Sequence, residues 1–497
     1  MFDNDLTLRR FYNPSFARPS AAFYDLRAGR MMMPDGSLRE GVRNVAEALT
    51  AENINALFCL TDGQADLLTH VETSLAEPWR VDEWTVTDNA DGGRVSCEGH
   101  AVYISLLSKS YFRTCDDLAV AFESFKALER IFLSHQKGGA PLHLLSSPTL
   151  TGLVHMQMNL PRGAAYEPLS DEVLSLIAQY TTQSRTQILT LPAVKKISEF
   201  HYYDGRFMYA AGAFYELPAG RPTRDTVSEF VPYSVGWYRV AAQVPSDWAH
   251  VGILPLRNPT PDDGRGMWLW PDEPLFTFDD VWVTEPELRL AIKHNWRVEV
   301  RERLLWPDKN AKPLRAWQQS IVNMRDEAAR TLSEPVRGHV RRALQGLLYN
   351  AVGSMAARDE KQSVDLSPAQ FVAERRTFTP EVRATLTPLD NGKFRVIKPR
   401  KKSAFRARLA RYEWSAYIWA RARVMLTERM LSVPRSSILG CRTDAVYLTS
   451  KPNWQDSGHC GQFVSKGFLS GKLTAPRTPQ ELIAMKSRAE KGGADNG

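Results

Sequence analysis

Two aspartates in this sequence lie in settings where carboxylates could hold metal ions. Asp204 directly follows the aromatic run FHYY, and Asp444 lies in the short RTD segment between the hydrophobic runs SSILGC and AVYLTS. When folding brings two strand-borne carboxylates together, they can hold divalent ions that clamp the attacking and leaving oxygens of a phosphoryl transfer. A lone aspartate in a strand is more often a turn or surface residue, so this chemistry is predicted only if the two meet.

The elements around these aspartates are predicted from hydrophobic periodicity and turn residues. Residues 195–300 read mainly as strands, because the runs FHYYDGRFMYAAGAFYELPAG, VGWYRVAAQV and WRVEVRERLLW are aromatic and β-branched. Residues 312–358 change to helix, with Ser333 as the N-cap and Pro335 in the first turn. Apolar residues then recur at helical spacing: Val336, Val340, Leu344, Leu347 and Ala351.

A second long helix is predicted before Pro434, which blocks further helix. One face of this helix would carry Phe405, Leu409, Tyr412, Ala416 and Trp419. Two short strands around the RTD turn follow, so Asp444 belongs to a predicted hairpin. The C-terminal residues are polar and charged, and we expect them to fray.

The N-terminal part of the chain predicts a separate α/β domain. Strand-like runs (AAFYDL, NALFCL and HAVYISLL) accompany a helical stretch, DDLAVAFESFKALERIFL. The Pro- and Gly-bearing segment NLPRGAAYEPLSDEV closes this part and makes a plausible boundary near residue 175.

Composition narrows the class of protein. The chain has 497 residues, 43% of them hydrophobic, which is enough for a large core divided among two or three domains. No stretch approaches the roughly 20 apolar residues of a membrane span, and the N-terminus lacks an apolar signal core. We therefore expect a cytoplasmic protein without a membrane partner. The sequence has no GxxxxGK loop, HExxH motif or nucleophile elbow that would favour another enzyme class.

Positive charge is concentrated in one segment. The formal net charge is +7, and residues 393–411 contain nine lysines and arginines with no aspartate or glutamate. Such a run is typical of a solvated basic face or linker. It is also typical of a segment that contacts the phosphates of a nucleic acid. Under the second interpretation Lys398, Arg400, Lys401 and Lys402 would bind DNA.

Three segments, taken in order, resemble the motifs of family B DNA polymerases from phages, linear plasmids and mobile elements. Residues 203–211, followed by Leu217-Pro218, resemble motif A, D-x-x-S-L-Y-P-S. Residues 349–354 resemble motif B, K-x-x-x-N-S-x-Y-G, and residues 438–447 resemble motif C, Y-x-D-T-D-S. Residues 462–467 lie where the family has the lysine of its K-x-Y motif. The resemblance spans about residues 180–467.

The resemblance implies an α+β multi-domain fold, with a family B polymerase-like palm, helical fingers and an N-terminal RNase H-like (exonuclease-like) α/β domain. The implied segments are 1–175, the degenerate exonuclease-like domain; 176–310, the first part of the palm with motif A; 311–360, the fingers with motif B; 361–467, the second part of the palm with the basic segment and motif C; and 468–497, a short thumb remnant or flexible tail.

The resemblance also implies a role for each matching residue. Asp204 and Asp444 would be catalytic and would bind two Mg²⁺ ions, with the carbonyl of Gly205 as a supporting ligand. Tyr209 would lie under the incoming sugar and exclude a 2′-hydroxyl. Asn350 would face the nucleotide from the fingers helix. Lys466 would contact the primer-template.

Several positions depart from the family pattern. Arg442 replaces the first aspartate of motif C, where a guanidinium repels Mg²⁺ unless it points at a phosphate, and with Thr443 it would contact DNA. Whether residues 442 and 444 share a face is left open, because a turn lies between them. Gly346 occupies the position of the motif B lysine, and Arg342, one turn earlier, could substitute for it. Arg341 and Arg325 are further candidates for the triphosphate; the alternative for each arginine is an exposed helix charge.

The N-terminal domain departs from the exonuclease pattern. In FYDLR, Asp25 resembles the first exonuclease carboxylate, but its acidic partner two residues later is Arg27. The strand run HAVYISLL lacks the second aspartate, so we predict no proofreading. The segment TTQSRTQ resembles the Y-x-G-G-R linker of the family with Arg185 retained, and this arginine would contact DNA.

The leading hypothesis is template-directed DNA synthesis: nucleotidyl transfer from a dNTP to a primer 3′-hydroxyl, with two metal ions and without editing. The expected partners are a DNA primer-template, a dNTP and, from the relatives it resembles, a priming terminal protein or other replication factors. The alternative is a polymerase-derived nucleic-acid-binding protein that has lost turnover, with Arg442 and Gly346 as the traces of that loss. An unrelated α/β protein is the third possibility.

Overall fold

The computed structural model describes residues 20–492 except residues 51–53, 62–66, 68–69, 72–79, 83–92, 98–99, 108–110, 113–114, 137–141, 146, 162–168, 227–228, 259–266, 309, 357–359, 384, 390–392 and 401–409. The chain divides into two compact units. The first comprises Met1–Met158 and Ser320–Ala410, and the second Asn159–Gln319 and Arg411–Gly497. Each is described below by itself.

The first unit contains a seven-stranded mixed sheet in the order β3-β2-β1-β4-β7-β6-β5. Its strands are β1 (Ala21–Asp25), β2 (Arg30–Met32), β3 (Leu38–Glu40), β4 (Ala56–Leu60), β5 (Arg80–Asp82), β6 (Gly93–Cys97) and β7 (His100–Leu106). Strands β1, β4 and β7 run parallel, and β1 and β4 are buried along their whole length. Continuous burial explains why AAFYD and ALFCL lack the alternation of a half-exposed strand.

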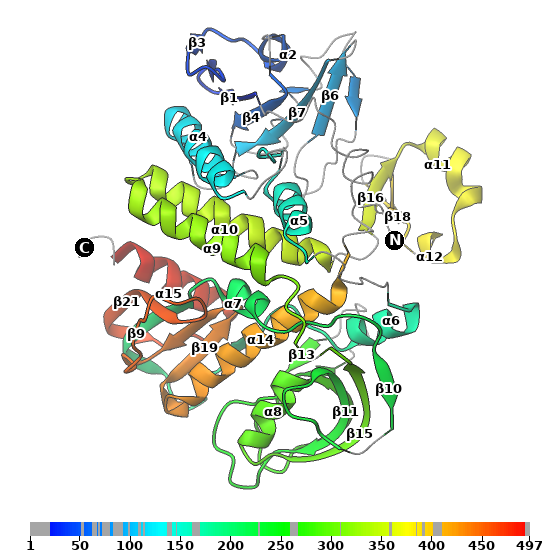
Figure 1. Cartoon of the computed structure of the whole chain (residues 1–497), viewed down its shortest axis with the longest axis vertical. Coiled ribbons are helices and arrows are strands. Elements are labelled where there is room, and N and C mark those ends of the chain that lie inside the picture. Colours follow the sequence, from blue (N-terminus) through cyan, green and yellow to red (C-terminus); the bar gives the residue numbers. More distant parts are fainter. Residues whose placement is uncertain are drawn as a thin grey trace. The chain divides into compact units, whose positions relative to one another are not determined.

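The helices of this unit include α2 (Val45–Leu49), α4 (Leu118–Ser134), α5 (Pro148–Met158), α10 (Val336–Met355) and the part of α9 (Arg315–Thr331) from Ser320 onward. Helix α4 begins at the N-cap Asp117 and packs on β1 and β2, and α10 packs on α4 and α5 (Figure 1). The predicted apolar stripe of α10 is confirmed, because Val340, Leu344 and Leu347 are buried.

The chain between α10 and residue 400 forms a small lobe with its own core. Its elements are β16 (Glu360–Leu366), α11 (Pro368–Glu374), the 3-10 turn η3 (Arg375–Thr377), α12 (Pro380–Arg383), β17 (Thr387–Pro388) and β18 (Phe394–Arg400). The three strands form a sheet in the order β16-β18-β17. Four buried side chains form the core: Leu366, Phe378, Val382 and Val396.

The second unit is built around a five-stranded sheet in the order β21-β9-β20-β19-β8. The strands are β8 (Thr186–Ile188), β9 (Lys196–Gly205), β19 (Ile438–Arg442), β20 (Ala445–Leu448) and β21 (Phe463–Thr474). Every neighbouring pair is antiparallel. Strand β9 is therefore flanked by β20 and β21, which come from the distant C-terminal part of the chain.

A second sheet in this unit has the order β10-β15-β11-β14. Its strands are β10 (Thr223–Asp225), β11 (Val235–Gln243), β14 (Thr277–Thr284) and β15 (Arg297–Trp306); β12 (Leu256–Asn258) and β13 (Met267–Leu269) form a separate pair. The helical elements of the unit are α6 (Asp171–Gln179), α7 (Met208–Phe214), α8 (Glu285–Lys293), α14 (Tyr412–Leu431), η4 (Arg435–Ser437) and α15 (Pro479–Gly492). The expectation that residues 195–300 are mainly strand is confirmed.

Two expectations about the second unit were wrong. The run after Asp204 was read as strand, but the chain turns at Phe207, whose φ is 52°, and continues as the short helix α7. The C-terminal residues were expected to fray, but β21 extends to Thr474 and α15 follows it. Helix α15 is held because its apolar stripe of Leu482, Met485 and Ala489 packs on the sheet.

The long helix before Pro434 is confirmed as α14, which ends at Leu431. Its predicted face is buried at Ala416 and Trp419, while Phe405 and Leu409 lie outside the described residues. None of the described helices combines the length and the apolar content that crossing a bilayer requires.

Candidate active site

Asp204 lies near the C-terminal end of β9, the second strand of the five-stranded sheet, between β21 and β20. It pairs with Ala445 of β20 on one side and with Val464 of β21 on the other. Directly opposed residues of antiparallel strands place their side chains on the same face, as do residues two apart on one strand. The side chain of Asp204 therefore shares a face with Tyr202.

Asp444 lies in the two-residue turn between β19 and β20. Thr443 supplies the left-handed conformation that the turn requires, with a φ of 59°, and its N–H donates to the carbonyl of Arg185 at 2.9 Å. The carbonyl of Asp444 accepts a 2.8 Å hydrogen bond from the N–H of Gly205. The turn carrying Asp444 is therefore fixed against the end of β9, directly beside Asp204. The predicted meeting of these two aspartates is thus found.

The surroundings of the pair are unfavourable to two negative charges. Burial, followed by the charge of Asp204, raises the pKa of Asp444 to about 7. Burial also raises the pKa of Asp204, although Lys466 and Lys486 oppose this effect. Among the described residues, neither carboxylate has a basic group within ion-pair distance. A cation bound between them would relieve both the desolvation and the repulsion.

The donor set fits a hard divalent cation. Carboxylate and carbonyl oxygens are the ligands that Mg²⁺ prefers, and this ion usually keeps waters or substrate phosphate oxygens in its remaining positions. The described residues contain no cluster of three or more His, Cys, Asp and Glu side chains that could enclose an ion. The chain therefore offers Asp204 and Asp444 for such an ion, with the carbonyl of Gly205 in the adjacent position.

Lys466 is brought to the carboxylate pair by an irregularity in β21. Ser465 pairs with Tyr203 and Gly467 with Tyr202, so Lys466 is the extra residue of a β-bulge. A bulge re-aims the side chain that it carries. Lys466 is exposed and lowers the pKa values of both aspartates, which places its ammonium group in electrostatic reach of the pair.

Helix α15 adds residues to this site that the sequence prediction missed. It packs on the face of the sheet that carries Tyr202 and Asp204, and the backbone approaches so closely that a Cβ on Gly467 would lie 2.4 Å from the carbonyl oxygen of Ala489 (Figure 1). The ammonium group of Lys486 lies 5.2 Å from the centre of the Tyr202 ring. Lys486 also lowers the pKa of both aspartates.

A sequence signal for this helix existed. Apolar residues at 482, 485 and 489 have the i, i+3, i+7 spacing of one helix face, and Glu481 fits the first turn. Lys486 and Glu490 then lie four residues apart on the neighbouring face and form an ion pair of 3.4 Å. Polar residues outnumber the apolar residues of this narrow stripe, so composition alone does not indicate the helix.

Tyr209 lies on α7, immediately after the turn that follows Asp204. The side chain is buried, and burial raises the pKa of its hydroxyl to about 12. The charge of Asp444 contributes in the same direction. The structure therefore places Tyr209 within electrostatic reach of Asp444, and its role beside a nucleotide stays a prediction.

Arg442 and Thr443 lie at the hairpin itself. Arg442 is the last residue of β19, and it is exposed and pairs with Ala445. The row Arg442, Ala445 and Asp204 runs across three neighbouring strands, so Arg442 and Asp204 share a face with their Cα atoms roughly 10 Å apart. The contacts of Arg442 and Thr443 with DNA stay predictions.

Arg185 corrects one of the predicted DNA contacts. The residue is fully buried, and its guanidinium donates to the carbonyl of Gly252 and the hydroxyl of Thr427, each at 2.9 Å, and to Gln187 at 2.8 Å. It also lies 5.1 Å from the ring centre of Trp270. Burial lowers its pKa to about 10. Arg185 therefore holds parts of the second unit together and cannot reach a nucleic acid.

The predicted triphosphate contacts lie on the helices of the first unit. Asn350, Arg342 and Arg341 are on α10, where Asn350 is half-buried and Arg342 is exposed, with its Nε donating to the carbonyl of Gly338 at 3.1 Å. Arg325 is half-buried on α9. Their roles toward a nucleotide stay predictions.

The basic segment is only partly described. Lys398 lies on β18, where its ammonium group pairs with Glu374 and lies 5.2 Å from the ring centre of Phe378. The backbone of Arg400 ends the same strand, while Lys401 and Lys402 lie outside the described residues. The interpretation of this segment as a DNA contact stays a prediction.

The overall fold is similar to solved structures of phi29 DNA polymerase. One is complexed with primer-template DNA and incoming nucleotide substrates, at a TM-score of 0.55 and 12% identity over 89% of this chain and 82% of that chain. Another, a post-translocation binary complex with primer-template DNA, gives a TM-score of 0.56 and 11% identity over 91% and 86%. A third, complexed with single-stranded DNA, gives 0.53 and 12% over 89% and 81%.

No protein-family model and no curated protein matches the chain. The likeness is therefore one of fold, and it covers most of both chains. The chain has the multi-domain α+β fold of the phage-type DNA polymerase of phi29.

Proposed function

We propose that this protein is a template-directed DNA polymerase. The observation that carries the proposal is the meeting of Asp204 and Asp444 at the end of β9, within a fold similar to that of phi29 DNA polymerase. Two half-buried carboxylates without a described ion-pair partner are suited to bind the divalent cations that phosphoryl transfer uses. Mg²⁺ is the ion that we propose, and it would polarise the phosphate and the attacking hydroxyl.

The proposed reaction is nucleotidyl transfer from a dNTP to a primer 3′-hydroxyl. The 3′-oxygen forms a bond to the α-phosphorus, the bond to the β-phosphate bridging oxygen breaks, pyrophosphate leaves, and the hydroxyl proton passes to solvent. Tyr209 would position the sugar, Lys466 would hold the primer-template next to the carboxylates, and Asn350 would contact the base or triphosphate.

We also propose that the protein does not proofread. Asp25, the one carboxylate that matches the exonuclease pattern, is buried at the end of β1. Its side chain accepts hydrogen bonds from the N–H groups of Arg27 and Ala28, and it lies 4.0 Å from the guanidinium of Arg30. These contacts occupy the carboxylate in closing the turn between β1 and β2.

A second candidate function is nucleic-acid binding without turnover. Arg442 at the first motif C position and Gly346 at the motif B lysine position favour it, because both remove a charged group that the family uses. The exposed Lys466 and Arg442 would then bind phosphates in the absence of chemistry.

Primer extension separates the two candidates. The full chain is incubated with a labelled primer on a longer template, dNTPs and either Mg²⁺ or EDTA, and compared with Asp204→Asn, Asp444→Asn and Asp247→Asn. Asp247 is an exposed carboxylate of the second unit with no described side-chain partner, so its variant controls for loss of a charge. Extension by wild type and Asp247→Asn alone supports the polymerase. Binding of the primer-template with no extension by wild type supports the second candidate.

A further inference from the structure

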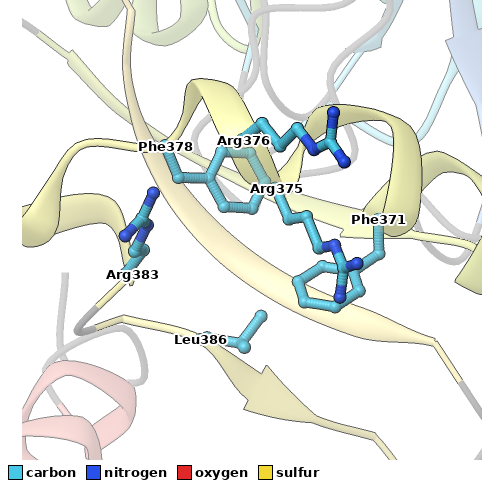
Figure 2. Close-up of a pocket in the computed structure, with 6 residues that line it drawn as sticks. All are labelled: Phe371, Arg375, Arg376, Phe378, Arg383 and Leu386. Carbon is cyan, nitrogen blue, oxygen red and sulfur yellow. The ribbon is translucent and has the colours of Figure 1, made fainter.

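The small lobe of the first unit contains a pocket that the proposed reaction does not use. It is about 480 Å³ in volume and is lined by Phe371, Arg375, Arg376, Phe378, Arg383 and Leu386. Figure 2 shows the two aromatic rings and the aliphatic side chain among the three arginines, with Arg375 and Arg383 on different sides of the group. The volume lies within the range of roughly 300–1,000 Å³ that is common for ligand sites.

The three arginines of this pocket differ from two other described cations of the lobe, Arg395 and Lys398. Arg395 makes a bidentate ion pair with Asp365, at 2.7 and 2.9 Å, and Lys398 pairs with Glu374. By contrast, Arg375, Arg376 and Arg383 are exposed, and no carboxylate of a described residue lies within ion-pair distance of them. The guanidinium groups of the lobe's described side chains that lack an ion-pair partner thus all line this pocket.

The apolar part of the pocket is held in position. The ring of Phe371 stacks on Phe394, with 4.4 Å between centroids and 23° between planes. Phe378 belongs to the core of the lobe, and its ring lies 6.3 Å from that of Phe371. Leu386 is 36% exposed at the edge of the pocket. Fixed aromatic and aliphatic surfaces therefore lie next to positive charge.

We propose that this pocket binds single-stranded nucleic acid, with a base against the Phe371 and Leu386 surface and the flanking phosphates on Arg375, Arg376 and Arg383. Guanidinium groups bind phosphate oxygens, and an aromatic face accepts any base by stacking. An acidic peptide would use the charges and leave the rings unused. A polymer is favoured over a free nucleotide because Arg375 and Arg383 lie on different sides of the pocket, so that contacting both requires phosphates on either side of a bound base (Figure 2).

The choice of nucleic acid as the partner rests on the proposed function, and the inference adds a binding site to that function. It uses neither Asp204 nor Asp444, so the two claims can fail separately. The binding assay is therefore made in EDTA with the Asp444→Asn chain, in which extension is excluded. The probe is a fluorescein-labelled oligothymidylate of about 12 nucleotides, within the site sizes of roughly 4–16 nucleotides that are known for single-strand-binding modules.

Two matched double variants distinguish the pocket from general positive charge. Arg375→Gln/Arg383→Gln removes two pocket arginines, and Arg130→Gln/Arg297→Gln removes two exposed arginines that lack a described partner elsewhere. We expect the pocket variant to bind the oligonucleotide about tenfold more weakly, with a salt dependence shallower by about 1.4 in log–log slope. We expect the control variant to bind within about twofold of the parent, because distant charges are screened by salt. Equal weakening by both variants would overturn the proposal.

A third variant tests the aromatic surface. Phe371→Leu keeps an apolar side chain in the lobe, so folding is checked by circular dichroism, and we expect at least about fivefold weaker binding with an unchanged salt slope. Unchanged affinity would contradict base stacking. In competition, displacement of the probe by polyglutamate as efficiently as by unlabelled oligothymidylate would assign the pocket to acidic chains and overturn the proposal. Displacement by dTMP alone at the same nucleotide concentration would also overturn it, in favour of a free nucleotide.

Discussion

Asp204 pairs in register with Ala445, and the carbonyl of the preceding residue, Asp444, accepts the N–H of Gly205 at 2.8 Å. These backbone contacts join two aspartates that are 240 positions apart in the sequence. The resulting carboxylate pair is half-buried, and burial with mutual repulsion raises the pKa of Asp444 to about 7. Burying these two like charges thus costs free energy in the folded state, and a bound cation would remove that cost.

This cost predicts how stability changes with pH. Because the folded-state pKa of Asp444 lies above the ordinary value near 4, the folded chain binds more protons than the unfolded chain between about pH 4 and pH 7. The contribution of Asp444 to stability is therefore lost as the pH rises through this window. We expect Asp444→Asn to match wild type at pH 4.5 and to be more stable at pH 8 by on the order of 2 kcal/mol. Thermal unfolding in EDTA at both values checks this, and an equal difference at both pH values would contradict it.

Lys466 is expected to contact the primer-template rather than to stabilise the fold, because it is exposed on a bulge. We expect Lys466→Ala to weaken primer-template binding about three- to tenfold and to reduce the salt slope by about 0.9. Fluorescence anisotropy over a series of KCl concentrations measures both quantities. Lys472→Ala, an exposed lysine on the same strand, is the control. A similar effect of the two variants would remove the special role of the bulge.

Lys486 is expected to tune the carboxylate pair from α15. Its charge lowers the pKa of both aspartates, so replacing it with methionine raises these pKa values. At low pH the single-turnover incorporation rate falls as the aspartates become protonated. We expect this acid limb of the pH profile to lie at higher pH in Lys486→Met than in wild type. Lys491→Met, an exposed lysine of the same helix, should leave the limb in place. A loss of rate without a displaced pH profile would indicate that Lys486 acts only in packing α15.

Arg185 is expected to matter for stability and not for DNA binding. Arg185→Met would leave the carbonyl of Gly252 and the hydroxyl of Thr427 without their buried donor. Lost charge-assisted hydrogen bonds and unsatisfied buried acceptors predict a destabilisation of about 3 kcal/mol. Unfolding measures this change, and primer-template affinity well below the unfolding temperature should stay within about twofold of wild type. If Arg185→Met were as stable as wild type but bound the primer-template more weakly, the prediction that Arg185 contacts DNA would stand.

The sequence was sufficient to predict the hairpin around Asp444 and the strand that carries Asp204, but not where that strand ends. Both are hydrophobic runs bounded by turn residues, and such local patterns determine strands directly. It also predicted helices α10 and α14 from apolar periodicity. The resemblance of three segments, in order, to family B motifs implied a polymerase-like fold, and the comparison with solved structures confirms that fold.

Tertiary contacts determine the features of the structure that the sequence did not predict. The run YAAGAF forms α7 because Gly212 lets α14 approach: a Cβ there would lie 3.1 Å from the carbonyl oxygen of Ile418. Arg185 is buried because its acceptors come from Gly252 and Thr427, distant in sequence. Helix α15 depends on the sheet surface on which its narrow apolar stripe packs. None of these partners can be read from local pattern alone.

Binding of Mn²⁺ tests the central claim most directly, because it reports on the carboxylate pair without requiring turnover. Free Mn²⁺ is measured by electron paramagnetic resonance as it is titrated into wild type, Asp204→Asn, Asp444→Asn and the control Asp247→Asn at pH 8. We predict a site in wild type and Asp247→Asn that is lost in both variants of the pair. Identical Mn²⁺ binding by all four proteins would contradict the assignment of Asp204 and Asp444 as metal ligands.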